Sequence, residues 1–280
     1  MTDAITVRSL HKSYGKAVAV DGVDLDVRAG EVFALLGPNG AGKTTTVEIL
    51  EGFRRRTSGD VRVLGVDPQQ GDAAWRARVG VVLQSTGEFD DLTAREVVHH
   101  FANYYPAAAD PDEIITRVGL AEKQHARTRT LSGGQKRRLD VALGIVGRPE
   151  LLFLDEPTTG FDPEARREFW GLIRDLARAG TTILLTTHYL DEAEALADRV
   201  GVLAGGQLVA VDTPDRLGGR GEAGVTVGWL GPDGPVTERT ETPTALVARL
   251  AETFGGEVPG LTVTRPSLED VYLRMIGAGE

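Results

Sequence analysis

Residues 37–44 read Gly37-Pro38-Asn39-Gly40-Ala41-Gly42-Lys43-Thr44, and this stretch decides the fold. It is the full Gly-x-x-x-x-Gly-Lys-Thr pattern of a phosphate-binding P-loop, set between the apolar run 32–36 and a helix expected from Lys43. Glycines let backbone N–H groups turn toward phosphates, and the positive end of the helix dipole faces the same anion. The alternative is a Gly-rich turn that matches by chance, which the flanking strand and helix disfavour.

The last residues of this stretch predict how a nucleotide and its metal are held. Lys43 would neutralise the β- and γ-phosphates, and the Thr44 hydroxyl would bind Mg²⁺. The remaining contacts to the nucleotide are expected from the loop and from the first turn of the helix, namely Gly37, Asn39, Gly40, Ala41, Gly42 and Thr45.

Two acids close a second apolar run, at residues 151–154. An interior strand delivers such carboxylates to its C-terminal end, the edge at which α/β sheets bind ligands. Asp155 would hold Mg²⁺, directly or through water, and Glu156 would polarise the attacking water as the catalytic base. Any strand can end in Asp-Glu at a turn, so this motif indicates a catalytic site only because it follows a P-loop in the sequence.

The pattern of apolar residues predicts the fold class. Alternation before residue 28 predicts antiparallel strands, and helical spacing dominates from about 89 to 145. Continuous apolar runs typical of buried parallel strands follow the P-loop at 79–83, 151–154, 182–186 and 200–203. We therefore predict an α/β fold with a P-loop core, an antiparallel β subdomain and a helical insertion.

Glycine and proline cluster between residues 218 and 235, which predicts a domain boundary near Arg220. We expect a nucleotide-binding domain at 1–220 and a small α+β accessory domain at 221–280. The last helix of the accessory domain is expected to begin at Ser267, which has capping-box spacing to an acid three residues later.

Composition narrows the classes of function. The 31 basic and 41 acidic side chains sum to −10, so the net field does not favour nucleic acid or anionic lipid. The lack of cysteine excludes a disulfide framework and is compatible with the cytoplasm. The first residues lack the basic and apolar regions of a signal peptide, and no stretch approaches the roughly 18 to 20 uncharged apolar residues of a membrane helix, so we expect another protein to cross any membrane at which it acts.

The decisive motif is Leu131-Ser132-Gly133-Gly134-Gln135, which stands before a helical segment. Taken alone, it is compatible with an ordinary helix N-cap. Behind a P-loop, it resembles the signature motif of ABC ATPases, and the resemblance extends over residues 3–220. It implies the fold of an ABC nucleotide-binding domain and assigns Ser132, Gly133, Gly134 and Gln135 to nucleotide binding.

The resemblance implies roles for three further residues. Gln84 is similar to the glutamine that senses Mg²⁺ and the γ-phosphate, and His188 to the switch histidine that contacts the γ-phosphate. Tyr14 is similar to the aromatic residue that stacks on adenine. A structural histidine and a half-exposed strand tyrosine are the alternatives. Residues 160–162 occupy the D-loop position, where Phe161, which is also apolar, replaces the usual leucine.

The resemblance also implies partners. Two copies would pack head to tail, with each ATP held between one P-loop and the signature motif of the other copy. A cytoplasmic helix of a separate permease would enter a cleft at residues 84–92, where we expect Glu88, Asp90 and Asp91 to pair with its basic residues. Residues 266–272 resemble the tail of daunorubicin-resistance-type exporter ATPases, which favours export of a drug-like or lipophilic compound from the cytoplasmic face of the cell membrane.

Other functions stay open at this point. A soluble ABC ATPase acting on ribosomes or DNA is disfavoured by the single P-loop, by the lack of long heptad repeats and by the acidic net charge. A regulatory subunit that binds ATP without cleaving it is disfavoured by the presence of Glu156 and His188. Import competes with export, and only the short tail favours export. The resemblance implies that the permease chooses the cargo.

Overall fold

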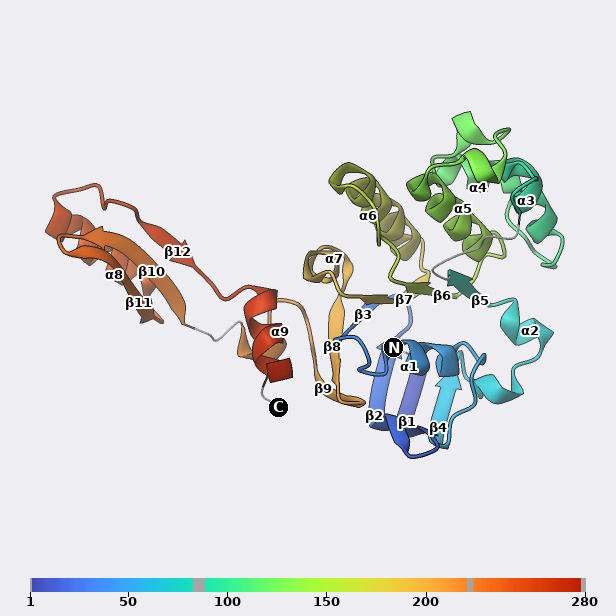
Figure 1. Cartoon of the computed structure of the whole chain (residues 1–280), viewed down its shortest axis with the longest axis horizontal. Helices are drawn as coiled ribbons and strands as arrows, with labels where there is room; N and C mark the ends of the chain where they lie inside the picture. The colour runs from blue at the N-terminus through green and yellow to red at the C-terminus, as the bar shows by residue number, and fades with distance from the viewer. Residues whose placement is uncertain (1, 83–88, 221–223, 278–280) are drawn as a thin grey trace. The chain divides into compact units, whose positions relative to one another are not determined.

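The computed structural model describes residues 2–82, 89–220 and 224–277 and divides the chain into two compact units, Met1–Val211 and Asp212–Glu280. The first unit holds the two larger sheets with most of the helices, and the second holds a small sheet and two helices (Figure 1). This division falls ahead of the boundary near Arg220 that the glycine and proline content predicts.

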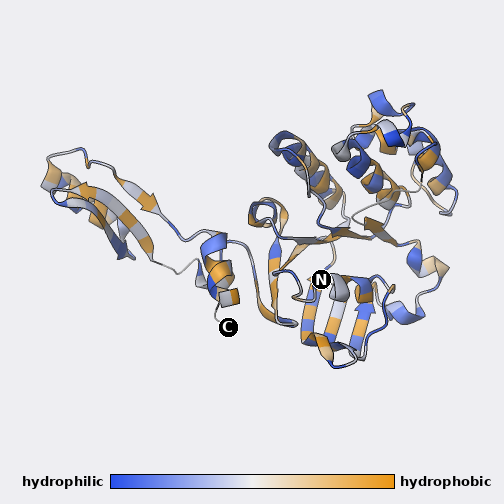
Figure 2. Ribbon diagram, in the orientation of Figure 1, coloured by the Kyte–Doolittle hydropathy of each residue, from blue (hydrophilic) through white to orange (hydrophobic). Residues whose placement is uncertain are grey.

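A six-stranded sheet with the strand order β5-β6-β7-β3-β8-β9 forms the core of the first unit. All five residues of the central strand β3 (Val32–Leu36) are buried, and hydrophobic residues mark the central strands in Figure 2. Such strands read as continuous apolar runs because both faces of a parallel sheet are covered. The other strands are β5 (Val79–Val82), β6 (Leu151–Asp155), β7 (Thr182–Thr187), β8 (Arg199–Ala204) and β9 (Gln207–Asp212).

An antiparallel sheet with the order β2-β1-β4 packs its buried side chains into the same core. Its strands are β1 (Asp3–Tyr14), β2 (Ala17–Arg28) and β4 (Ser58–Val63). The expected alternation in β1 buries Ile5 and Val7, but Ser9 has a φ of 47° where the register with β2 shifts. The irregularity changes the phase of the strand, so that Leu10 is the next buried residue.

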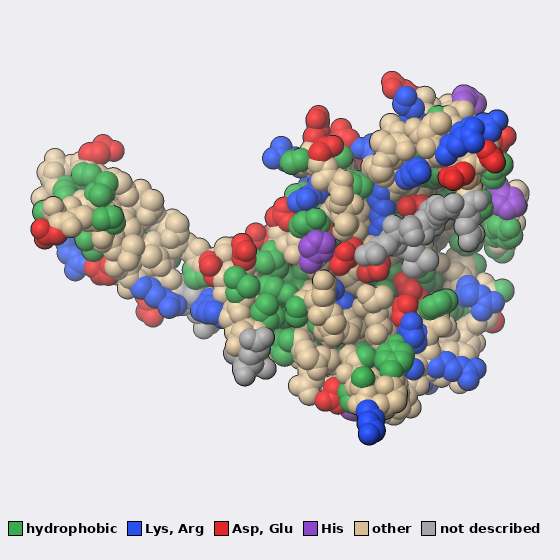
Figure 3. All heavy atoms as spheres, in the orientation of Figure 1, with side chains coloured by type: hydrophobic (Ala, Val, Ile, Leu, Met, Phe, Trp, Pro, Cys, Tyr) green, Lys and Arg blue, Asp and Glu red, His purple; other side chains and the backbone are tan. Residues whose placement is uncertain are grey.

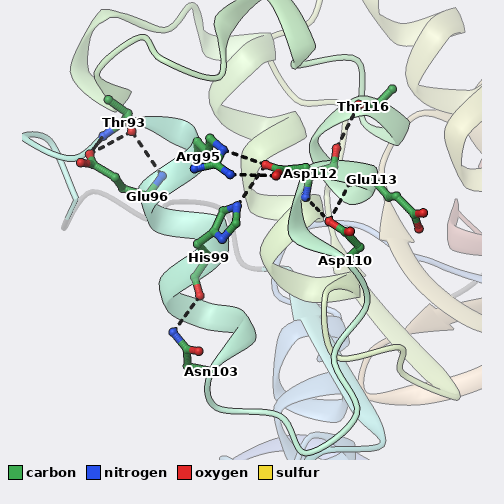
Figure 4. A network of polar contacts seen from close by, with 9 residues as sticks. All are labelled: Thr93, Arg95, Glu96, His99, Asn103, Asp110, Asp112, Glu113 and Thr116. Carbon is green, nitrogen blue, oxygen red and sulfur yellow. Dashed lines mark hydrogen bonds and ion pairs between the residues drawn. The ribbon is translucent and has the colours of Figure 1, made fainter.

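Three helices form the insertion expected at about 89–145, namely α3 (Ala94–Ala102), α4 (Pro111–Arg117) and α5 (Gly133–Ile145). A polar network ties α3 to α4 (Figure 4). Arg95 donates two hydrogen bonds of 2.8 Å to Asp112, and His99 lies 3.0 Å from the same carboxylate. Hydrogen bonds from Arg95 and then His99 lower the pKa of Asp112 to about 2.

The other helices of the first unit lie around the core sheet and the P-loop. They are α1 (Lys43–Leu50), α2 (Ala73–Arg76), α6 (Pro163–Arg178) and α7 (Leu190–Leu196), with short 3-10 turns η1 (Pro68–Gln70), η2 (Ala121–Lys123) and η3 (Thr128–Thr130). The predicted α/β class with an antiparallel subdomain and a helical insertion is therefore confirmed.

The second unit has its own small sheet, ordered β11-β10-β12. As predicted, its last helix is opened by a capping interaction, in which Asp270 accepts from the N–H and hydroxyl of Ser267 at 2.8 and 2.7 Å. The elements are η4 (Leu217–Gly219), β10 (Val225–Gly231), β11 (Gly234–Thr240), α8 (Pro243–Phe254), β12 (Thr262–Thr264) and α9 (Leu268–Gly277). Among the helices of residues 2–82, 89–220 and 224–277, none is both long enough and apolar enough to cross a membrane.

Candidate active site

The ends of three adjacent strands bring the predicted catalytic residues to one edge of the core sheet. The sheet order places β7 between β6 and β3, and all three run parallel. Asp155 ends β6, His188 follows the end of β7, and the P-loop follows the end of β3. Segments separated by more than a hundred residues therefore converge where open α/β sheets bind ligands.

The P-loop backbone is pressed against neighbouring strands at two of its glycines. A Cβ added to Gly37 would lie 2.3 Å from the carbonyl oxygen of Leu203, and one added to Gly42 would lie 2.3 Å from that of Ala19. Gly42 also has a φ of 99°, in the left-handed region that glycine adopts at least cost. Both positions require glycine for the loop to keep this path.

The first turn of α1 offers unpaired backbone donors to an anion. Its first backbone hydrogen bond runs from the N–H of Thr46 to the carbonyl of Gly42, at 2.9 Å. The N–H groups of Lys43, Thr44 and Thr45 precede that bond, and no carbonyl among the described residues accepts from them. These groups and the helix dipole together suit a phosphate group.

The Lys43 ammonium lies folded against the P-loop. Its Nζ donates to the carbonyls of Gly37 at 2.6 Å and Pro38 at 3.2 Å, and the residue is buried. Burial lowers the pKa of Lys43, while the nearby charges of Glu156 and Asp155 raise it. A bound polyanion such as a triphosphate would strongly stabilise a desolvated cation of this kind.

Thr186, on β7, fixes both acids at the end of β6. Its hydroxyl donates to Oδ1 of Asp155 at 2.5 Å. The N–H of Glu156 lies 3.1 Å from the carbonyl of Thr186 and 3.2 Å from its hydroxyl oxygen. Glu156 has a φ of 44°, which is uncommon for a residue with a side chain and persists only where the surroundings enforce it.

The predicted base and the predicted switch histidine meet. His188 Nδ1 lies 3.3 Å from Glu156 Oε1, and the Thr159 hydroxyl donates to Glu156 Oε2 at 3.4 Å. The His188 side chain is 44% exposed, against 19% for Glu156, so the histidine is the more accessible of the two. The centre of its ring lies 4.1 Å from that of Tyr189, and the two ring planes are tilted by 39°.

Three other groups of predicted site residues stand apart from this cluster. Ser132 and Gln135 form a capping box at the start of α5, and none of their hydrogen bonds within the described chain reaches the P-loop. Tyr14 ends β1 half exposed, with Lys12 Nζ 4.9 Å and Arg54 Cζ 5.3 Å from its ring centre. Gln84 lies outside the described residues.

Sequence reasoning missed two residues that hold this site together. Thr186 directly follows the apolar residues 183–185 of β7, and that change from apolar to polar marks it. Arg137 is buried although charged, and it lies four residues before Val141 and eight before Ile145, on the apolar side of α5. A charge on the buried side of a helix is the signal that singles out Arg137.

Comparisons with known proteins agree with this geometry. The sequence pattern of the family described as "ABC transporter" matches residues 20–159. The "Daunorubicin resistance ATP-binding protein DrrA3" of Streptomyces coeruleorubidus is 39% identical over 98% of this chain and 96% of its own. The "Nod factor export ATP-binding protein I" of Ralstonia nicotianae is 38% identical over 99% and 94% of the two chains.

Solved structures share the fold. An ATP-binding subunit of an ABC transporter superposes with a TM-score of 0.72 and 22% identity, covering 97% of this chain and 99% of that one. A dimeric ATP-binding cassette in a post-hydrolysis state with ADP and Pi gives a TM-score of 0.67 and 24% identity, over 75% and 98%. The chain therefore belongs to the ATP-binding subunits of ABC transporters, the ATPases of that family.

Proposed function

We propose that this ATPase powers the export of a drug-like or lipophilic compound through a separate permease at the cytoplasmic face of the cell membrane. The observation that carries the proposal is the convergence of the P-loop, Asp155, Glu156 and His188 at one sheet edge. The direction of transport is supported by the relatives, whose names refer to daunorubicin resistance and Nod factor export.

The residues of the site fit a magnesium nucleotide. Lys43 and the first N–H groups of α1 would bind the phosphates, and Tyr14 would stack on the adenine. The exposed Thr44 hydroxyl and the Asp155 carboxylate are hard oxygen donors of the kind Mg²⁺ prefers, with Gln84 as a further ligand. When bound, the metal would neutralise charge on the phosphates.

Two side chains would act on the attacking water. Glu156 would accept a hydrogen bond from it and take its proton, because the carboxylate is held at the strand edge that faces the P-loop. His188 would contact the γ-phosphate through Nε2, the ring nitrogen that Glu156 does not engage. The 3.3 Å contact between them would orient both.

A second copy of the chain would complete each site. Ser132 and Gly133 are exposed at the start of α5, and the N–H groups of Gly133 and Gly134 stand at the positive end of that helix. In a head-to-tail pair, these groups would reach the phosphates bound at the partner copy's P-loop. The dimeric cassettes among the structural neighbours support such a pairing.

A groove of about 320 Å³ between α2, β5, α3 and α5 would receive a cytoplasmic segment of the permease. Aromatic and apolar side chains line it together with Glu51 and Asp140. Asp91, expected to pair with the permease, already forms ion pairs with Arg127 at 3.3 Å and Arg129 at 3.1 Å. Asp91 would therefore meet a basic segment of the permease only by exchanging these partners, and Glu88 lies outside the described residues.

Two of the three arginines in the basic run at residues 54–56 are already engaged by acidic side chains. Arg54 pairs with Glu48, and Arg56 makes a two-point pair with Asp67 at 2.8 and 2.7 Å. Acidic and basic side chains are interspersed over the face of the first unit that Figure 3 shows. This mixture favours the transporter hypothesis over a soluble ATPase that acts on ribosomes or DNA.

Purification of the tagged chain from detergent-solubilised membranes tests the proposal. We expect a membrane-spanning protein to co-purify in stoichiometric amount, and ATP hydrolysis to drive loss of a lipophilic dye from vesicles that contain both proteins. Recovery in a nuclease-sensitive soluble complex would overturn the proposal, and ATP-driven uptake would reverse its direction.

A further inference from the structure

Arg137 of α5 holds the backbone on both sides of Glu156. Its Nε donates to the carbonyl of Pro157 at 3.0 Å, and its Nη2 donates to the carbonyl of Asp155 at 2.6 Å. The side chain is buried, so water does not compete for these two hydrogen bonds. One planar guanidinium thus binds the carbonyls that flank the catalytic glutamate.

The backbone between those carbonyls is strained. Glu156 has a φ of 44°, a conformation that costs about 1–3 kcal/mol for a residue with a side chain. Thr186 holds its N–H from β7, and Arg137 holds the neighbouring carbonyls from α5. The conformation of Glu156 is therefore enforced by two elements, and only one of them belongs to the sheet.

The buried guanidinium of Arg137 also has an acidic partner. Arg137 Nη1 lies 3.9 Å from Asp140 Oδ2, one turn further along the same helix, and both side chains are 8% exposed. A buried charge is costly unless it is paired and hydrogen-bonded, and methionine would fill the same volume without that cost. Packing alone gives no reason for an arginine at this position.

We propose that Arg137 is a positioning residue, whose guanidinium fork keeps Glu156 in the conformation needed for hydrolysis and ties it to the helix of the signature motif. The proposal rests on the proposed function, because that function makes Glu156 the base. The N-cap of that helix is Ser132, five residues before Arg137, so the element that would complete the partner copy's site also sets the glutamate of its own site.

The substitution Arg137→Lys tests whether the contact of one guanidinium with both carbonyls is needed. Lysine keeps the positive charge beside Asp140, so the variant should fold, but one ammonium cannot bind both carbonyls in the planar geometry of arginine. We expect kcat for ATP hydrolysis to fall at least about tenfold, with KM for ATP within about threefold and an unchanged Tm. Arg138→Met removes a cation from the same helix, where it pairs with Glu168, and should leave kcat within about twofold.

A double variant that combines Arg137→Lys with Glu156→Gln separates a positioning role of Arg137 from a structural one. If Arg137 acts through Glu156, Arg137→Lys should cause no further loss in a Glu156→Gln background, because groups that act as a unit are not additive. Wild-type kcat in Arg137→Lys, or an equal loss in both backgrounds, would overturn the proposal. Failure of the proposed function would appear instead as absence of hydrolysis in the unmodified protein.

Discussion

His188 and Glu156 face one another across the ends of β7 and β6, with 3.3 Å between Nδ1 of the imidazole and Oε1 of the carboxylate. The contact depends on the pairing of β6 with β7, which sets Asp155 opposite Thr186. A histidine fixed by a carboxylate keeps one nitrogen engaged and presents the other. The two side chains therefore orient one another.

Glu156→Gln should retain ATP binding and lose hydrolysis. The amide fills the same space but cannot take a proton from water, and a general base contributes roughly 10²–10⁴ to the rate. We expect at least a 100-fold fall in kcat, together with an ATP-dependent dimer in size-exclusion chromatography. Glu113→Gln, an exposed carboxylate on α4, is the control. Near-normal turnover would contradict the assignment of the base.

Lys43→Met should weaken nucleotide binding strongly. The variant keeps the buried stem of the side chain and removes the cation that donates to the carbonyls of Gly37 and Pro38. Loss of a buried charge facing a triphosphate should weaken ATP binding at least about 100-fold, at about 1.4 kcal/mol per tenfold change in affinity. Isothermal titration measures this. Lys123→Met, at an exposed residue of η2, should bind as the wild type does.

Gly42→Ala should distort the P-loop. The new Cβ would lie 2.3 Å from the carbonyl oxygen of Ala19, at a φ of 99° that alanine disfavours. We expect a loss of about 1–3 kcal/mol in the free energy of unfolding and loss of ATP binding. Denaturant titration and nucleotide titration report the two effects.

Gly171→Ala is the matched control for that substitution. Gly171 lies inside α6, where an added Cβ has no atom within 4 Å and φ is not in the left-handed region. Alanine should therefore raise the free energy of unfolding by about 1 kcal/mol, without an effect on ATP binding. Equal destabilisation by both substitutions would show that the P-loop geometry is not the cause.

Glu51 should make stability depend on pH. Burial, and then the charges of Asp155 and Glu48, raise the pKa of Glu51 to about 8 from an ordinary 4.5. The folded protein holds this proton more tightly than the unfolded chain. Its stabilising contribution is therefore complete below about pH 4.5 and is lost as the pH rises through about 8.

Glu51→Gln should flatten that dependence in the nucleotide-free protein. A tenfold difference in proton affinity corresponds to about 1.4 kcal/mol. The change in the free energy of unfolding between pH 5 and pH 8 should therefore be smaller in the variant by a few kcal/mol. Urea titrations at several pH values measure it. Glu122→Gln, at an exposed residue of η2, should leave the wild-type slope. An identical slope in Glu51→Gln would refute this prediction.

The sequence by itself determined the chemistry and the local structure of this protein. Residues Gly37–Thr44 predicted a loop between a strand and a helix, because glycine, lysine and threonine at that spacing are typical of a phosphate-binding P-loop. Continuous apolar runs predicted the parallel strands, and Asp155 and Glu156 followed one of them. These properties depend on neighbours a few residues apart, which is the range over which periodicity and capping act.

The tertiary structure decided which of those elements meet. Only the order β6-β7-β3 sets His188 beside Glu156 and both beside the P-loop, and that order depends on pairing between segments far apart in the chain. The two hydrogen bonds from Arg137 to the carbonyls around Glu156 depend on the packing of α5 against the end of β6. Local sequence patterns carry no record of such contacts, because they arise from how the side chains of distant elements fill one core.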